Sequence, residues 1–188
     1  MHNAQSDESR EEDVKALLGL IREFKSSKKE RSTPAYRQLA TIDRTKLLVL
    51  LDEILASDDD NSKCDAALVL LTFEARESLS KVLLLLEDDQ EFVRYFICGL
   101  IHDLGDMRAT EPLMRLATND RSIGVRMMAC YALGGVGSAD AIPVLQWIEE
   151  NDNGVIEDGR RVAEDAHEAI EAIEFRLART DQPSSLNY

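Results

Sequence analysis

A sequence repeat of 32 residues constrains the fold of this chain more than any other feature. The segment 91–105 recurs as the segment 123–137, with a Val-Arg pair at the same place in both copies. Apolar or small residues recur at the same positions, spaced three and four apart, which predicts one amphipathic helix in each copy. A unit of this kind cannot bury its apolar face alone, so consecutive units must stack on one another.

Less regular copies flank these two units, before them at a shift of 30 residues and after them at a shift of 37. The additional residues of the last copy fall in the segment 151–159. Glycine and proline are scarce and lie between the apolar stripes, so the sequence predicts an all-α chain. Helices are expected at residues 8–25, 45–56, 62–73, 78–86, 91–104, 109–117, 123–136, 140–150 and 160–177.

The units resemble HEAT repeats, in the short bacterial form that is also found in phycobilisome lyases. The resemblance rests on an aspartate turn followed by a Val-Arg pair, which occurs twice: Asp88-Asp89 with Val93-Arg94, and Asp120 with Val125-Arg126. It covers about residues 43–177. It implies a right-handed α-α superhelix (HEAT-repeat solenoid) of about four helix pairs, with an N-terminal helical cap and linker at 1–42 and a flexible C-terminal tail at 178–188.

The resemblance also implies that the helices 62–73, 91–104, 123–136 and 160–177 form the inner, concave layer, where HEAT proteins usually hold partners. Tyrosine, methionine and arginine are enriched in interface cores, so such residues outside the core stripe favour a protein-binding groove. For the two arginines, a structural bridge to turn aspartates of neighbouring units is at least as well supported. The predicted partner-binding residues are Arg94, Tyr95, His102, Arg126, Met127, Tyr131, Glu164, His167, Glu168 and Glu171.

A zinc site built from Cys98, His102 and Cys130 is the main metal hypothesis, because three soft ligands would lie on adjacent inner helices. Such helices lie about 10 Å apart, which strains ligand bonds of about 2.3 Å, and buried cysteines usually fill apolar space. We therefore predict no metal and no cofactor. Two roles remain open for Trp147: packing beneath a tail, or marking a second contact surface.

The formal net charge of −14 arises entirely after residue 57, where the sequence contains 26 acidic and 12 basic residues. This balance disfavours nucleic acid as a partner. No apolar run is long enough to cross a membrane, and an odd number of three cysteines suits a reducing compartment, so a cytoplasmic location is expected.

These observations favour a noncatalytic protein-binding scaffold with a basic partner, and one specific version is an immunity or inhibitor protein for a basic nuclease. The alternative, implied by the resemblance to phycobilisome lyases, is a bilin lyase-like or other pigment-handling factor that works with a partner subunit. A pigment pocket should leave Tyr95, Cys98, His102 and Tyr131 open around a groove.

Overall fold

The computed structural model describes residues 2–27, 32–73 and 75–180. These residues form ten α-helices and three short 3-10 helices, and their one extended pairing is an isolated bridge between Val155 and Arg161. The prediction of an all-α chain is confirmed. The chain divides into two compact units, residues 1–82 and 83–188.

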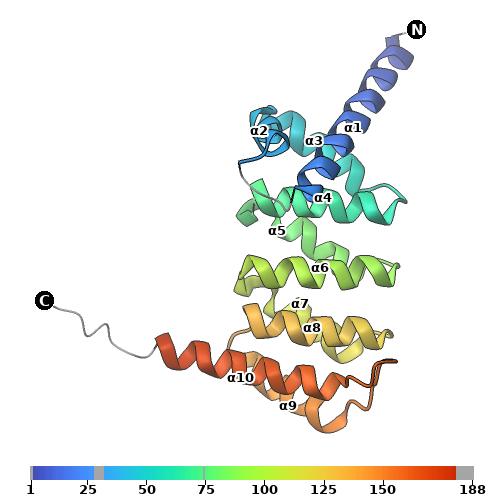
Figure 1. Cartoon of the computed structure of the whole chain (residues 1–188). Coiled ribbons are helices and arrows are strands. Elements are labelled where there is room, and N and C mark those ends of the chain that lie inside the picture. Colours follow the sequence, from blue (N-terminus) through green and yellow to red (C-terminus); the bar gives the residue numbers. More distant parts are fainter. Residues whose placement is uncertain (1, 28–31, 74, 181–188) are drawn as a thin grey trace, which may run out of the picture. The chain divides into compact units, whose positions relative to one another are not determined.

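Unit 1 joins the N-terminal helices to the first predicted helix pair (Figure 1). Thr33 caps one helix by accepting from the Tyr36 amide, and Asp43 caps the next by accepting from the Lys46 amide. The predicted boundary between residues 42 and 43 lies inside this unit. Its helices are α1 (His2–Ser26), α2 (Pro34–Thr41), α3 (Arg44–Leu55), α4 (Asp60–Phe73) and most of α5 (Ala75–Leu84).

The first helix packs on its neighbours through apolar residues spaced three and four apart. Leu17, Ile21 and Phe24 are almost completely buried. The Phe24 ring lies 5.9 Å from that of Tyr36 and 6.4 Å from that of Phe73, measured between ring centroids. Helices α1 and α2 therefore share a core with the first helix pair.

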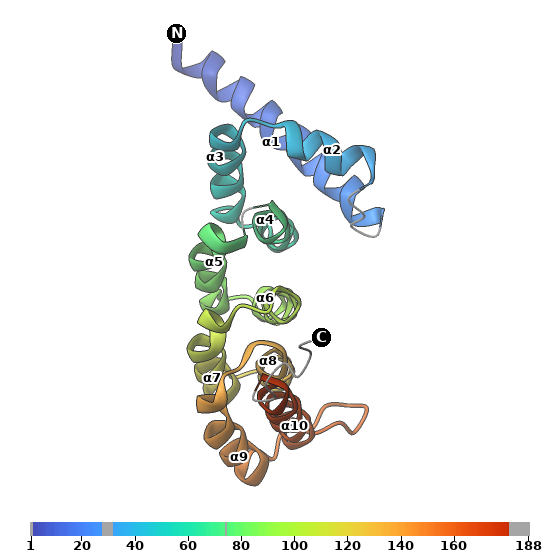
Figure 2. The same ribbon diagram turned by 90° about the vertical axis from the view of Figure 1, so that its left-hand side faces the viewer.

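Unit 2 is a stack of helix pairs. Figure 2 shows α7 and α9 in one layer and α6, α8 and α10 in the other, which we call the inner layer. The elements of unit 2 are η1 (Leu85–Glu87), α6 (Glu91–Leu104), η2 (Met107–Ala109), α7 (Thr110–Asn119), α8 (Ile123–Val136), η3 (Ala139–Ala141), α9 (Ile142–Asn151) and α10 (Val162–Thr180).

The core of unit 2 repeats with the period of the sequence. Residues 32 positions apart are fully buried in pairs: Val93 with Val125, Ile97 with Ala129, Ile101 with Leu133, and Leu113 with Leu145. Burial of these side chains between the layers is the main force that joins consecutive units.

The contact between α8 and α10 depends on small residues. A side chain at Gly134 would begin 3.3 Å from the Cα atom of Ala169, so glycine permits the close approach. Arg176 of α10 donates to the carbonyls of Gly134, Gly135 and Gly137 at the end of α8, which satisfies carbonyls that have no partner within that helix. Helix α10 continues to Thr180, so residues 178–180 of the predicted tail are helical, and its remainder lies outside the described residues.

Candidate functional site

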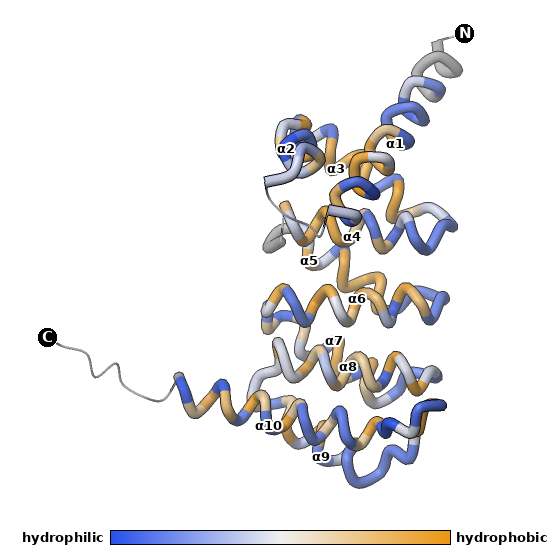
Figure 3. Tube along the Cα trace, viewed as in Figure 1, coloured by the Kyte–Doolittle hydropathy of each residue, from blue (hydrophilic) through white to orange (hydrophobic). Residues whose placement is uncertain are grey.

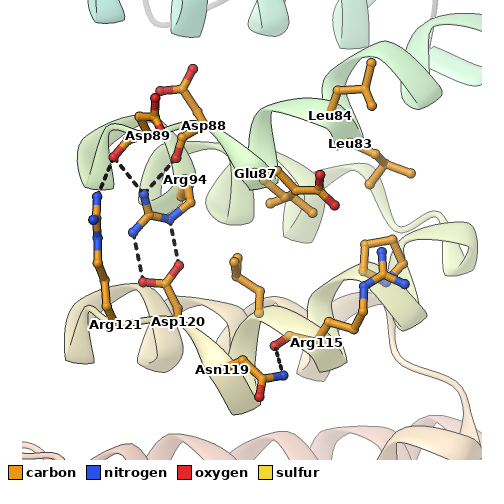
Figure 4. Close-up of a pocket in the computed structure, with 13 residues that line it drawn as sticks. Leu83, Leu84, Glu87, Asp88, Asp89, Arg94, Arg115, Asn119, Asp120 and Arg121 are labelled. Atoms are coloured by element: carbon orange, nitrogen blue, oxygen red, sulfur yellow. Dashed lines mark hydrogen bonds and ion pairs between the residues drawn. The ribbon is translucent and has the colours of Figure 1, made fainter.

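The two arginines of the Val-Arg pairs bridge consecutive units. Arg94 of α6 donates from Nε and Nη2 to the Asp120 carboxylate, at 2.6 and 2.9 Å, and from Nη1 to the carbonyls of Asp88 and Asp89. Figure 4 shows this guanidinium between the turn that precedes α6 and the turn that follows α7. One unit later, Arg126 repeats the arrangement with the Asp152 carboxylate. We call these two pairs the arginine ladder.

The ladder occupies both arginines within the protein. Arg94 is only 5% exposed, so the prediction that its side chain faces a partner is wrong, and the structural alternative describes it correctly. Arg126 is slightly more exposed, but its Nε and Nη2 atoms are both held by Asp152. The reason is chemical: a planar guanidinium binds a carboxylate bidentately and can still cap turn carbonyls.

Burial alone raises the pKa of Asp120, but the hydrogen bonds and charge of Arg94 outweigh that effect and hold the pKa below its usual value. The pKa of Asp152 is lowered for the same reason, through Arg126. The ladder carboxylates therefore stay ionised and paired at neutral pH. A surface pocket of about 620 Å³ borders the first pair, between η1 and α7, with Leu84, Leu116 and Arg121 among its lining residues (Figure 4).

Two tyrosines on the inner layer are open to solvent, as predicted from their position outside the core stripe. Tyr95 of α6 is 43% exposed and Tyr131 of α8 is 46% exposed. His102 stacks on Tyr131, with ring centroids 4.0 Å apart, and its Nδ1 lies 3.1 Å from the Tyr131 carbonyl oxygen. The histidine therefore supports the tyrosine rather than facing a partner by itself.

The two tyrosines line a pocket of about 340 Å³ on the inner side of unit 2. Met127, one of the predicted contact residues, is only 6% exposed, although it borders this pocket. Its neighbour Met128 is more open, so the predicted surface of this helix is wrong at Met127 and correct at Tyr131. The remaining lining residues come from the start of α8, from the segment that leads into α10 and from the first turn of α10: Gly124, Ile156, Asp158, Arg160 and Asp165.

The predicted residues of α10 form a separate group. Glu164, His167 and Glu168 line a different pocket of about 430 Å³ together with Glu149 of α9. The Nδ1 atom of His167 lies 2.9 Å from a carboxylate oxygen of Glu149, and Glu171 is 3.6 Å from Nε2 of the same ring. The structure thus places the ten predicted residues in three environments: the ladder, the tyrosine pocket and the exposed side of α10.

The proposed cysteine ligands lie in the core. Cys98 and Cys130 are fully buried, and burial raises the pKa of the Cys130 thiol to about 12 and that of Cys98 still further. Thiols of this kind stay protonated and unreactive. Within residues 2–27, 32–73 and 75–180, no group of three His, Cys, Asp or Glu side chains is placed to hold a metal ion.

The sequence analysis missed Asp165, which is the most unusual polar residue of the inner layer. Its side chain is almost completely buried, Oδ1 accepts from Arg160 at 2.6 Å, and Oδ2 has no hydrogen-bond partner among the described residues. Burial is the main reason that its pKa is raised above the usual value. An aspartate between the buried positions 162 and 166 of an amphipathic helix is the signal that could have revealed it.

The fold and this site define a class of protein, a stack of α-helix pairs whose inner layer presents residues for contact. The sequence model of HEAT repeats matches residues 79–174, and the chain belongs to the HEAT-repeat family. HEAT repeats generally serve in protein interaction rather than in catalysis. A search of the curated proteins gives no match. Among the described helices, none is both long and apolar enough to span a membrane.

Proposed function

We propose that this chain is a noncatalytic protein-binding module, and that unit 2 holds a partner with a basic surface. The observation that carries this proposal is an imbalance of charge. Residues 83–180 contain nine arginines and no lysine, against 19 aspartates and glutamates.

Most of these arginines are already engaged within the protein. Arg121 and Arg176 donate to backbone carbonyls, and Arg179 lies over the Phe175 ring at 5.5 Å. Five others form ion pairs with carboxylates of the chain: Arg94, Arg108, Arg115, Arg126 and Arg160. The exposed carboxylates of α10 therefore dominate the field around the C-terminal half, and they include Glu164, Glu168, Glu171 and Glu174.

A field of one sign accelerates encounter with a partner of the opposite sign and rejects partners of the same sign. The open tyrosines supply the other element of an interface, since Tyr95 and Tyr131 can bury a large amphipathic surface at little entropic cost. In this proposal the carboxylates of α10 direct the approach and the two tyrosines anchor the complex.

A finer version of the proposal is a cytoplasmic immunity or inhibitor protein that masks a basic nuclease. The support for it is the acidic charge alone, which matches the need of such inhibitors to bind fast. Enzymatic assays of the captured partner, with and without this chain, test it.

The pigment-handling alternative gains no specific support from the site. It requires Cys98 and His102 to lie open around a groove, but Cys98 is fully buried and His102 is stacked on Tyr131. The expectation is wrong for Cys98, which packs in the core, whereas Tyr95 and Tyr131 are open and His102 is half-buried. An absorption spectrum of the purified chain after incubation with a bilin tests this alternative, which requires that the chain retain the pigment.

The proposed function is tested by capture and then by kinetics. The tagged full chain is used to capture partners at low and at high salt, and the association rate of the purified partner is then measured at both. We expect the double variant Glu171→Gln, Glu174→Gln to slow association by roughly three- to tenfold at low salt. The matched control, Asp140→Asn with Glu150→Gln, removes the same charge from the outer layer and should change the rate less than twofold.

Two results would contradict the proposal. One is a partner whose association does not depend on salt or on the two glutamates of α10. The other is a complex that survives Tyr95→Ala combined with Tyr131→Ala without loss of affinity.

A further inference from the structure

Aromatic side chains lie open to solvent along the inner layer of unit 2. Phe92 and Tyr95 of α6 are 50% and 43% exposed, and Tyr131 of α8 is 46% exposed. The Phe92 ring lies beside that of Phe96, with ring centroids 6.1 Å apart. Together with Met128, these four rings make up what we call the aromatic strip. Large apolar side chains that gather on one exposed surface mark a contact site.

The aromatic strip is continuous from α6 to α8. Tyr95, Met128 and Tyr131 line the tyrosine pocket together. A side chain at Gly99 of α6 would begin 4.0 Å from Sδ of Met128, so the methionine of α8 reaches across to α6. The two phenylalanines are one helical turn apart and lie next to the tyrosine of α6 on its open face. All five side chains of the strip are uncharged, and all belong to unit 2.

The strip presents side chains rather than backbone groups to a partner. Four of its five residues lie in the interior of α6 or α8, where amides and carbonyls are bonded within the helix. The neighbouring segment 152–161 is bonded to itself, since the Ile156 amide donates to the Arg160 carbonyl at 3.0 Å. An extended segment laid on the strip would bury backbone groups without partners, which costs free energy. A helix satisfies its own backbone, so the strip favours a helical segment.

The segment 152–161 gives the strip a raised border. Figure 2 shows this segment projecting beyond α10 on the side of the inner layer. A bridge between Val155 and Arg161 closes it, and its Ile156 and Asp158 line the tyrosine pocket. An apolar floor with a wall beside it matches a helix that buries one face and leaves the other in solvent.

Charges beside the strip favour a basic segment. Asp103 is exposed on α6, about three helical turns after the first strip residue and on the same face. Asp158 borders the tyrosine pocket. Arg160 is the one cation among the described lining residues of this pocket, and it is paired with both Asp165 and Glu168, at 2.6 and 3.1 Å. A helix with one apolar face and basic side chains next to it complements the floor and the border together.

We propose that the aromatic strip binds one amphipathic α-helix of the basic partner, with basic side chains of that helix beside Asp103 and Asp158. The bound helix has about three turns, because Phe92 and Asp103 are separated by about 16 Å along α6. The inference rests on the proposed function, because it gives the form of the partner segment that the two tyrosines hold. The flexible thioether of Met128 adapts the strip to the apolar side chains of that helix.

The test uses synthetic peptides, so that it does not depend on finding the partner. The probe is a fluorescent peptide of about 14 residues, with leucine along one helical face, lysine on the other and a lactam link that holds it helical. We expect it to bind the full chain with a dissociation constant of about 10 μM, measured by fluorescence anisotropy. Three peptides should each bind roughly tenfold more weakly or worse: one of shuffled sequence, one with two central prolines, and one with glutamate in place of lysine.

Variants of the chain then assign the probe to the strip. Phe92→Ala combined with Tyr95→Ala removes two exposed rings and should weaken binding by roughly tenfold or more, and Tyr131→Ala on the other helix by roughly threefold. Trp147→Ala removes an exposed ring from the outer layer and should leave the affinity within about twofold, as the matched control. Asp158→Asn should weaken binding by roughly two- to threefold. Circular dichroism of each variant verifies that it is folded.

The outcomes separate this inference from the proposed function. If the shuffled or the proline peptide binds as well as the helical one, or the strip variants bind the probe as the natural chain does, the helix site is wrong. If a basic partner is captured and depends on Glu171 and Glu174 while the helical peptide does not bind, the proposed function stands and the helix site fails. If the peptide binds as expected and no basic partner is captured, the helix site stands and the proposed function fails.

Discussion

Unit 2 uses the same pair of residue types, arginine and aspartate, in two places with opposite results. In the ladder, both oxygens of Asp120 and Asp152 are held by one guanidinium, and the pKa of each carboxyl is lowered. Beside the tyrosine pocket, Arg160 holds only one oxygen of Asp165, and the pKa of that carboxyl is raised. A complete pair joins units to one another, whereas the incomplete pair leaves one buried carboxylate oxygen without a donor among the described residues.

The difference follows from the local backbone. A ladder arginine sits one turn into an inner helix, so it reaches both the preceding turn and the aspartate of the next unit. Arg160 lies in the segment before α10, where residues 152–161 replace the short turn of the other units, and Figure 3 shows this segment as largely hydrophilic. The longer segment brings its arginine to Asp165 from one side only.

The largest effect should follow from breaking the most buried pair of the ladder. Arg94→Ala leaves the Asp120 carboxylate buried without its partner and should lower the free energy of unfolding by about 3–5 kcal/mol. Urea denaturation of the full chain measures this. Arg115→Ala, which breaks an exposed pair with Glu111 on α7, is the matched control and should cost less than about 0.5 kcal/mol.

A smaller loss is expected at the second step of the ladder. Arg126→Ala should lower the free energy of unfolding by about 2 kcal/mol, because this pair is more exposed and its arginine caps one turn carbonyl where Arg94 caps two. If urea denaturation gives the same loss of free energy of unfolding for both arginine variants, then the burial of a ladder pair does not determine how much it stabilises the protein.

The pocket aspartate should behave in the opposite way. Asp165→Asn removes a buried charge that is only half paired, so the free energy of unfolding at pH 7 should stay constant or rise by up to about 1 kcal/mol. Thermal unfolding of the variant beside the natural chain measures the change. A loss above about 2 kcal/mol would show that Asp165 belongs to the structural class of the ladder.

The pH dependence of stability should also separate the two regions. The ladder carboxyls have lowered pKa values, so their contribution is present above pH 3.8 and is lost as the pH falls below it. Asp165 has a raised pKa, so its cost is absent below pH 3.8 and grows as the pH rises through the folded value. The stability gained by Asp165→Asn should therefore increase from pH 4 toward neutrality, whereas urea midpoints that differ equally at all pH values would contradict this.

The sequence predicts the fold because the stacking of units depends on positions that repeat. Residues 32 apart, such as Val93 and Val125, are buried alike, and the arginines that follow them make the same bonds. The tyrosines of the inner layer could be predicted for the same reason, since they lie beside a core stripe that is itself repeated.

The pocket could not be predicted in this way because its key residues do not repeat. The segment 152–161 has no counterpart in the other units, and the approach of Arg160 to Asp165 depends on how that segment turns. Met127 was placed on the surface instead of Met128 because apolar spacing alone does not distinguish neighbouring methionines in a mostly apolar helix.

The most direct test of this account compares the stability of two variants of the full chain. The free energies of unfolding of Arg94→Ala and Asp165→Asn are determined side by side by urea denaturation at pH 7. The account predicts a loss of about 3–5 kcal/mol for Arg94→Ala and no loss for Asp165→Asn. Equal losses in the two variants would contradict it, because Asp165 would then be one more structural pair.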